Sequence, residues 1–209
     1  MKKGDSLAMK TTVCLVLALL MFASAAVAES PSKSVADLNR FTVSTEGKGG
    51  ANATLGIVVT AEANGTLLEY AEAVAVCQQE MAKLTEAGNM ADYFGEVTDV
   101  DGNEVDLEEK LGADADDPLS VFEFYPVVAS GFKKGCGLVT VSMQFATAYE
   151  EGQKVLVLIG LIQEEKGARS IAWKAFDGKG VKGGIQVELP EKFIMQIQAG
   201  MALLAIVSR

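Results

Sequence analysis

The chain has 209 residues, of which 49% are hydrophobic and 22% charged, a composition typical of a folded globular protein rather than a disordered one. Its formal net charge of −10 argues against nucleic acid and anionic membranes as partners, because both require basic surfaces. The chain contains no histidine, which excludes histidine-dependent triads, histidine metal ligands and a histidine pH switch.

The N-terminus carries the pattern of an export signal. Three lysines precede an apolar stretch at residues 13–23, and Ala26-Val27-Ala28 then form a small-x-small cleavage site. We therefore predict a signal peptide at residues 1–28 and a mature chain that is secreted or held at the cell surface, with no membrane segment after cleavage. Either Met1 or Met9 serves as the start in this interpretation.

Two cysteines follow the predicted signal peptide, Cys77 and Cys136. An oxidising compartment permits a disulfide between them, and two unpaired thiols are the alternative. Both interpretations stay open, because a disulfide requires a short distance that the sequence does not give. A cysteine nucleophile is not expected, since there is no histidine to serve as its base.

An amphipathic helix is predicted at residues 67–87. Thr66 is placed to cap it, with Glu69 at the capping-box spacing, and Ala87-Gly88-Asn89 stops it. The apolar stripe comprises Leu67, Tyr70, Ala71, Val74, Cys77, Gln78, Met81 and Leu84. The predicted outer side comprises Glu72, Gln79, Glu80, Lys83 and Glu86.

A hairpin is predicted at residues 97–107, because Asp101-Gly102 lies between alternating apolar residues. Asp99, Asp101 and Asn103 also have the first spacings of a calcium loop. That loop needs glycine at its sixth position and glutamate at its twelfth, which here hold Glu104 and Lys110. We therefore expect no metal at this turn.

The C-terminal half is organised around residues 138–162. Residues 139–146 alternate between apolar and polar, which indicates a half-buried strand. Residues 155–162 are apolar almost throughout, which indicates a strand covered on both faces. We predict that the two form a hairpin joining an outer-facing strand to a central one. Upstream, Phe122 and Phe124 alternate in a strand that Pro126 limits to an edge.

The glycine-rich residues 177–184 are predicted to be a hairpin loop. A phosphate-binding loop would be followed by a helix, whereas the alternation at residues 185–189 predicts a strand. Pro190-Glu191 then opens a short helix, and residues 202–207 form a last, wholly apolar strand. The helix is expected to turn three apolar residues inward, Phe193, Ile194 and Ile197.

These elements predict an α+β protein. We expect an immunoglobulin-like antiparallel β-sandwich at about residues 118–209, and a strand-helix-hairpin unit at residues 51–117 packed on it. Residues 29–50 are predicted to be a linker or leader, with a short strand at Phe41 and Val43. Because residues 155–162 and 202–207 are apolar on both faces, the predicted helix is expected to cover them.

Four stretches of the sequence, taken together, are similar to stretches found in a known group of proteins. They are Tyr93-Phe94-Gly95, residues 121–124 with Pro126, residues 145–149 with residues 152–155, and residues 197–200 running into the last strand. Over residues 55–208 the chain resembles a loose group of uncharacterised exported proteins of Gram-positive anaerobes. The resemblance implies a bacterial host and an extracellular location, and no activity.

The leading functional expectation is a non-enzymatic extracellular domain that binds or scaffolds a protein or glycan, without catalytic, cofactor or metal residues. One alternative is an enzyme that acts on a wall polymer or glycan through carboxylates. Its candidate acids are Glu123, Asp99, Asp101 and Asp177, the last of these near Trp173. A second alternative is a subunit of a surface assembly, in which the edge strand at residues 122–125 accepts a partner strand.

Overall fold

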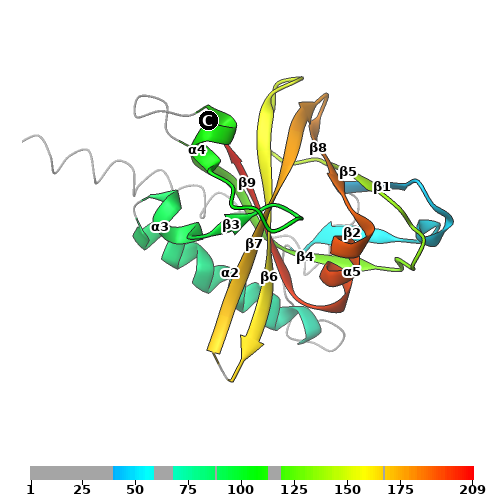
Figure 1. Cartoon of the computed structure of the whole chain (residues 1–209), viewed down its shortest axis with the longest axis horizontal. Helices are drawn as coiled ribbons and strands as arrows, with labels where there is room; N and C mark the ends of the chain where they lie inside the picture. Colours follow the sequence, from blue (N-terminus) through cyan, green and yellow to red (C-terminus); the bar gives the residue numbers. More distant parts are fainter. Residues whose placement is uncertain (1–39, 59–67, 88, 113–118, 167) are drawn as a thin grey trace, which may run out of the picture. The chain divides into compact units, whose positions relative to one another are not determined.

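One sheet of nine strands organises the protein (Figure 1). The computed structural model describes residues 40–58, 68–87, 89–112, 119–166 and 168–209, all within the compact unit Ser34–Arg209. The predicted signal peptide and the predicted helix cap Thr66 lie outside the described residues. The strands are β1 Phe41–Thr45, β2 Thr54–Ile57, β3 Val97–Thr98, β4 Ser120–Ser130, β5 Val139–Met143, β6 Lys154–Glu165, β7 Ala168–Val181, β8 Gly184–Leu189 and β9 Ala202–Ser208. The helices are the 3-10 turn η2 Lys48–Gly50 and the α-helices α2 Leu68–Ala87, α3 Met90–Phe94, α4 Leu107–Leu111 and α5 Glu191–Ala199.

The sheet curls into a nearly closed barrel. Its order is β1-β5-β8-β7-β6-β9-β4-β2, with antiparallel pairs along the whole path, and β1 and β2 approach each other without a ladder between them. The short strand β3 adds to β7 in parallel. The predicted α+β class is therefore confirmed. An immunoglobulin-like sandwich at residues 118–209 is not confirmed, because one hydrogen-bonded path joins all the strands instead of two separate sheets.

The predicted hairpin between β5 and β6 is wrong, although both strands exist. β5 pairs with β1 and β8, whereas β6 pairs with β7 and β9. Residues 144–153 between them are far longer than a tight hairpin turn, so the chain can leave one part of the barrel and enter another. The local patterns were correct, since β5 buries alternate residues and β6 is central.

Among the described residues, β4 is an edge strand at residues 122–125, as predicted, and becomes a central strand only after Pro126. It pairs with β9 on one side and with β2 on the other, where the ladder covers Val127 to Ser130. Pro126 sits where this second ladder ends, and its carbonyl oxygen accepts a last hydrogen bond from Val58 N at 2.9 Å. Proline has no N–H with which the ladder could continue.

The sheet separates two apolar regions. The inner core fills the barrel, and α5 contributes its three predicted residues to it. Its main members are Val139, Val141, Met143, Val155, Val157, Ile159, Phe193, Ile194, Ile197, Ala202, Leu204 and Ile206. The outer layer lies between the barrel and the other helices. Its members are Cys77, Phe94, Val97, Leu107, Leu111, Phe124, Leu156, Leu158, Trp173, Ala175, Leu203, Ala205 and Val207.

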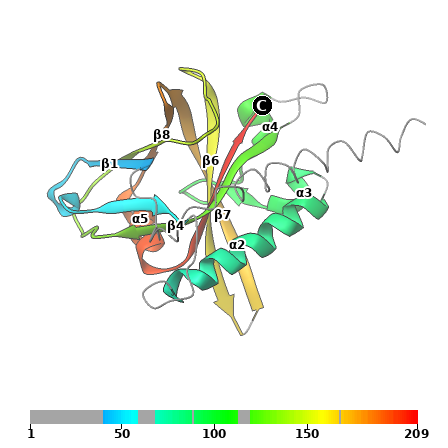
Figure 2. The ribbon, with the colours of Figure 1, turned by 180° about the vertical axis from the view of Figure 1, so that it is seen from behind.

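The outer layer explains why β6 and β9 are apolar on both faces. Helix α2 crosses the sheet on this side, and its Cys77 packs in the layer, as predicted (Figure 2). Segments after α2 complete the cover: Phe94 comes from α3, Val97 from β3, and Leu107 and Leu111 from α4. Helix α2 lies in this layer, as predicted, but it packs most closely on β4, and it supplies only part of the cover that was predicted for β6 and β9.

The buried face of α2 is rotated from the predicted stripe. Ala73, Val76 and Cys77 are buried, together with Glu80, which is only 8% exposed. Gln78, assigned to the apolar stripe, is exposed instead. The prediction for Glu80 was wrong because its charge was taken to require the solvent side.

The glycine-rich stretch is mainly strand. β7 continues to Val181, and only the turn at Lys182-Gly183 separates it from β8. A Cβ on Gly180 would collide with the Glu150 carbonyl oxygen, and one on Gly184 with that of Met143. These glycines permit close backbone contacts inside the sheet, so the predicted loop is two residues long.

Strand pairs cross the predicted boundaries between the segments of the chain. β1 occupies part of the proposed linker, and β2 and β3 pair with β4 and β7 across the proposed boundary near residue 118. Cys77 and Cys136 are both unpaired and buried, one in the outer layer and one in the inner core. Within the described ranges, no helix has the length and apolar composition needed to cross a membrane.

Candidate binding groove

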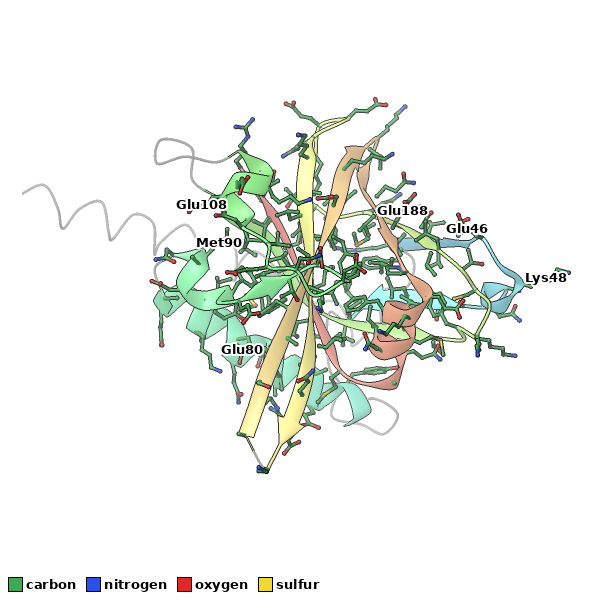
Figure 3. All side chains as sticks on the ribbon, viewed as in Figure 1. Glu46, Lys48, Glu80, Met90, Glu108 and Glu188 are labelled. Carbon is green, nitrogen blue, oxygen red and sulfur yellow. The ribbon has the colours of Figure 1, made fainter. Side chains whose placement is uncertain are left out.

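A groove of about 610 Å³ lies between α2, α3 and the first half of β7. We call it the α2–β7 groove. Helix α2 contributes Glu80 and Lys83, α3 contributes Tyr93 and its neighbours, and β7 contributes residues from Arg169 to Trp173. Figure 3 shows Glu80 on α2 beside β7. The groove therefore joins a helix surface to a strand edge.

Glu80 is the buried charge of this groove. Its Oε1 accepts a hydrogen bond from Lys83 Nζ at 2.6 Å, and its Oε2 accepts one from the Tyr93 hydroxyl at 3.2 Å. A buried carboxylate without partners would cost several kcal/mol, and here both oxygens are satisfied. Glu80 is thus a fixed structural charge that orients Lys83 and Tyr93 at the groove surface.

Aromatic rings form the wall beneath Glu80. Tyr93 stands edge-on to Phe94, with ring centroids 4.8 Å apart, and Phe94 stands edge-on to Trp173 at 4.9 Å. Burial, and then the negative charge of Glu80, raise the pKa of Tyr93 well above its ordinary value of 10, so its hydroxyl stays a donor. The same two causes raise the pKa of the Cys77 thiol to about 12.

β7 presents a strand edge to the groove. From Ala168 to Ala172 it pairs with β6 on one side, and its other side first meets β3 at Trp173. Within the described residues, no strand pairs with that side before Trp173. Ile171 and Trp173 pack toward the outer layer, and Arg169 Nη2 contacts Glu72 Oε1 at 2.7 Å. Alternate side chains of β7 therefore face α2.

The groove carries surplus negative charge. Lys83 pairs with Glu80, and Arg169 pairs with Glu72. Glu86 and Asp92 also line the groove, are exposed, and form no ion pair in the part of the chain that the structure describes. Two carboxylates are therefore available to a cationic ligand.

The structure brings only two of the predicted acids together. Asp99 and Asp177 line a second depression of about 640 Å³, next to α4. Lys110 Nζ lies 3.0 Å from both oxygens of Asp177. The described residues contain no group of three or more acids or cysteines placed to hold a metal ion.

Asp99 organises its own turn. Its Oδ1 accepts hydrogen bonds from the backbone N–H groups of Asp101 and Asn103, and its Oδ2 accepts one from Asn103 Nδ2. The side-chain hydrogen bond from Asn103, followed by the backbone bond, lowers the pKa of Asp99. Asp99 therefore stays ionised and is unsuited to act as a general acid. Asp101 does not line the depression.

Glu123 lies elsewhere, on the inner side of β4. A bulge between Val121 and Glu123 shifts the register, and Glu123 is only 7% exposed. Its Oε1 accepts a hydrogen bond from the Thr147 hydroxyl at 2.6 Å. Burial, and then the charge of Glu123, raise the pKa of Tyr149, whose buried hydroxyl has no hydrogen-bond partner in the described part of the chain. Glu123 is thus remote from the depression that Asp99 and Asp177 line.

Sequence reasoning missed Glu80 and the open edge of β7. Glu80 was detectable, because it follows Val76 by four residues and Cys77 by three and so shares their helix face. The strand edge had no local signal, since it depends on which strands pair.

The comparisons with known proteins do not place the chain in a family. No protein-family model matches the chain, and no significant match was found among curated proteins or among solved structures. The functional assignment therefore rests on the groove itself.

Proposed function

We propose that this protein is a non-enzymatic, exported binding domain that holds another extracellular molecule in the α2–β7 groove. The signal-like residues 1–28 and the resemblance to exported proteins of Gram-positive anaerobes support the location. The immunoglobulin-like arrangement stays a prediction about the scaffold and carries no part of this proposal.

The observation that carries the proposal is the Glu80–Lys83–Tyr93 cluster. Glu80 is buried while the Lys83 side chain is largely exposed, so the pair carries charge from the protein interior to the groove surface, which favours a role in recognition. Both oxygens of Glu80 are already occupied by donors. This arrangement suits a rigid polar surface for a ligand and offers no free general base.

The alternative of a carboxylate-dependent enzyme on a wall polymer or glycan would use Asp99 and Asp177. Asp177 forms an ion pair with Lys110, and the pKa of Asp99 is lowered, whereas acid catalysis needs a carboxyl whose pKa is raised. Binding is therefore the better supported function. Assembly through a strand edge is a form of binding, and the open side of β7 is the observation that favours it.

The test uses the mature protein from Glu29 and the surface fraction of the cells that produce it. Ala87→Trp places a large ring in the groove, and Ala146→Trp makes the same change at an exposed loop position. We expect Ala87→Trp to reduce retention by the surface fraction at least tenfold and Ala146→Trp to leave it unchanged. Equal retention of the two variants, or release of soluble sugar from the wall by the wild type, would contradict the proposal.

A further inference from the structure

We propose that the occupant of the α2–β7 groove is an extended, basic peptide segment of another extracellular protein, which adds as a strand to the open side of β7. This inference rests on the proposed function, because it names the ligand of the same groove. Strand addition supplies affinity through backbone hydrogen bonds and specificity through alternate side chains.

The open side of β7 offers the backbone groups. Ala168 to Ala172 are bonded to β6 on one side, and in the described structure β3 reaches only Trp173 and Lys174 on the other. An exposed strand edge carries unpaired N–H and C=O groups that accept a further strand. The groove gives room for that strand beside β7, in line with β3.

The residues that line the groove also determine which side chains of the peptide would fit. Successive residues of a strand point to opposite faces, so every second residue of the peptide would face α2. On that side it would meet Tyr93 and Ile171, which are partly exposed, and the carboxylates of Glu86 and Asp92. Lysine suits this side, because its apolar stem can cover Tyr93 and Ile171 while its ammonium group reaches the carboxylates, and apolar residues then occupy the opposite face of the peptide.

A glycan fits the groove less well than a peptide. Glycans commonly use exposed ring faces, because aromatic side chains combine an apolar face with polar edges. Trp173 and Phe94 are each only 4% exposed, so their faces are covered by the outer layer. A second copy of this chain also fits poorly, since two chains with a net charge of −10 repel each other.

The probe is a capped peptide of about ten residues that alternates lysine and valine, titrated into the mature protein by calorimetry. One control peptide carries N-methyl groups on alternate residues, which removes the edge donors and keeps the charge. A second control replaces lysine by glutamate. We expect binding of the first peptide, at least tenfold weaker binding of the N-methylated peptide, and no binding of the acidic one.

Amide hydrogen exchange locates the added strand. About every second amide at residues 168–172 should exchange at least tenfold more slowly when the lysine–valine peptide is bound, because only alternate N–H groups face the open side. Glu86→Lys should weaken binding roughly fivefold through charge repulsion. Glu108→Lys, the same change on the remote helix α4, should leave it unchanged (Figure 3).

The outcomes separate this inference from the proposed function. If the N-methylated peptide binds as tightly as its parent, or if neither peptide binds, strand addition is overturned. The groove proposal survives that result as long as Ala87→Trp still blocks surface retention. Slow exchange at residues 168–172 without peptide, in a sample that sediments as a dimer, would assign the edge to a second copy of this chain instead.

Discussion

The inner core and the outer layer use the two faces of the same strands for different purposes. The inner core is mainly apolar, is enclosed by the curled sheet and completed by α5, and has the buried Glu123 beside it on β4. The outer layer is covered by separate helices, and it contains the buried charge of Glu80 at the border of a groove. The inner face therefore mainly holds the fold together, whereas the outer face also borders the α2–β7 groove, the proposed binding surface.

The largest expected effect comes from two neighbouring leucines of β9. Leu204 faces the inner core and Leu203 the outer layer, and both are fully buried. We expect Leu204→Ala to lower the free energy of unfolding by about 4 kcal/mol and Leu203→Ala by about 3 kcal/mol. The difference follows because helices can shift to fill a cavity more easily than a closed ladder of strands. Urea denaturation measures the free energy of unfolding of both variants. A larger loss for Leu203→Ala than for Leu204→Ala would contradict the difference drawn between the inner core and the outer layer.

The second effect comes from two glycines that lie on opposite faces. A Cβ on Gly160 would lie 2.9 Å from the ring of Trp173, and one on Gly178 would lie 2.8 Å from a methyl group of Val155. Each alanine substitution should cost about 1–3 kcal/mol through overpacking. Only Gly160→Ala should also shift the fluorescence of Trp173, the single tryptophan of the chain. An equal spectral shift in Gly178→Ala would show that the two regions are not separate.

A third effect is a loss of stability at alkaline pH. Burial, and then the charge of Glu123, raise the pKa of Tyr125 to about 12, and burial raises the pKa of Tyr93 as well. Between pH 10 and 12 the unfolded chain would release these phenolic protons while the folded chain retains them, so the free energy of unfolding should fall as pH rises. Urea denaturation across this interval measures the fall, and a constant free energy would contradict the burial of these hydroxyls.

The smallest effect is expected at the groove. Glu80→Gln keeps the size of the side chain but removes the charge that pairs with Lys83, so stability should fall by only about 1 kcal/mol. The pKa of Tyr93 should also fall, because the charge of Glu80 contributes to raising it. Ultraviolet titration of the tyrosine hydroxyl in the variant and the wild type measures this change. An unchanged titration would show that the charge of Glu80 does not raise the pKa of Tyr93.

Local patterns predicted the individual elements well and their partners poorly. The period of two located β5, and the spacing of Phe193, Ile194 and Ile197 gave the buried face of α5. The pairing of β5 with β8 had no local signal, because hydrogen-bonded partners are chosen by the whole sheet. The prediction therefore placed β5 beside β6, its neighbour in sequence.

The candidate site was harder to predict than the fold. Glu80 was assigned to solvent on account of its charge, although its spacing from Cys77 placed it on the buried face. The glycines of residues 177–184 were taken to end a strand, whereas they allow β7 to pass close to neighbouring backbone. In both cases the residue type favoured one environment and the tertiary contacts imposed another.

Photocrosslinking from inside the groove tests the central claim most directly. A benzophenone side chain replaces Gln79, an exposed residue lining the groove, or Gln144, an exposed residue in the segment between β5 and β6. Exposed to the surface fraction of the producing cells, the mature protein should form a crosslink from position 79 and none from position 144. Crosslinks of equal yield from both positions, or from position 144 alone, would show that the α2–β7 groove is not where the partner binds.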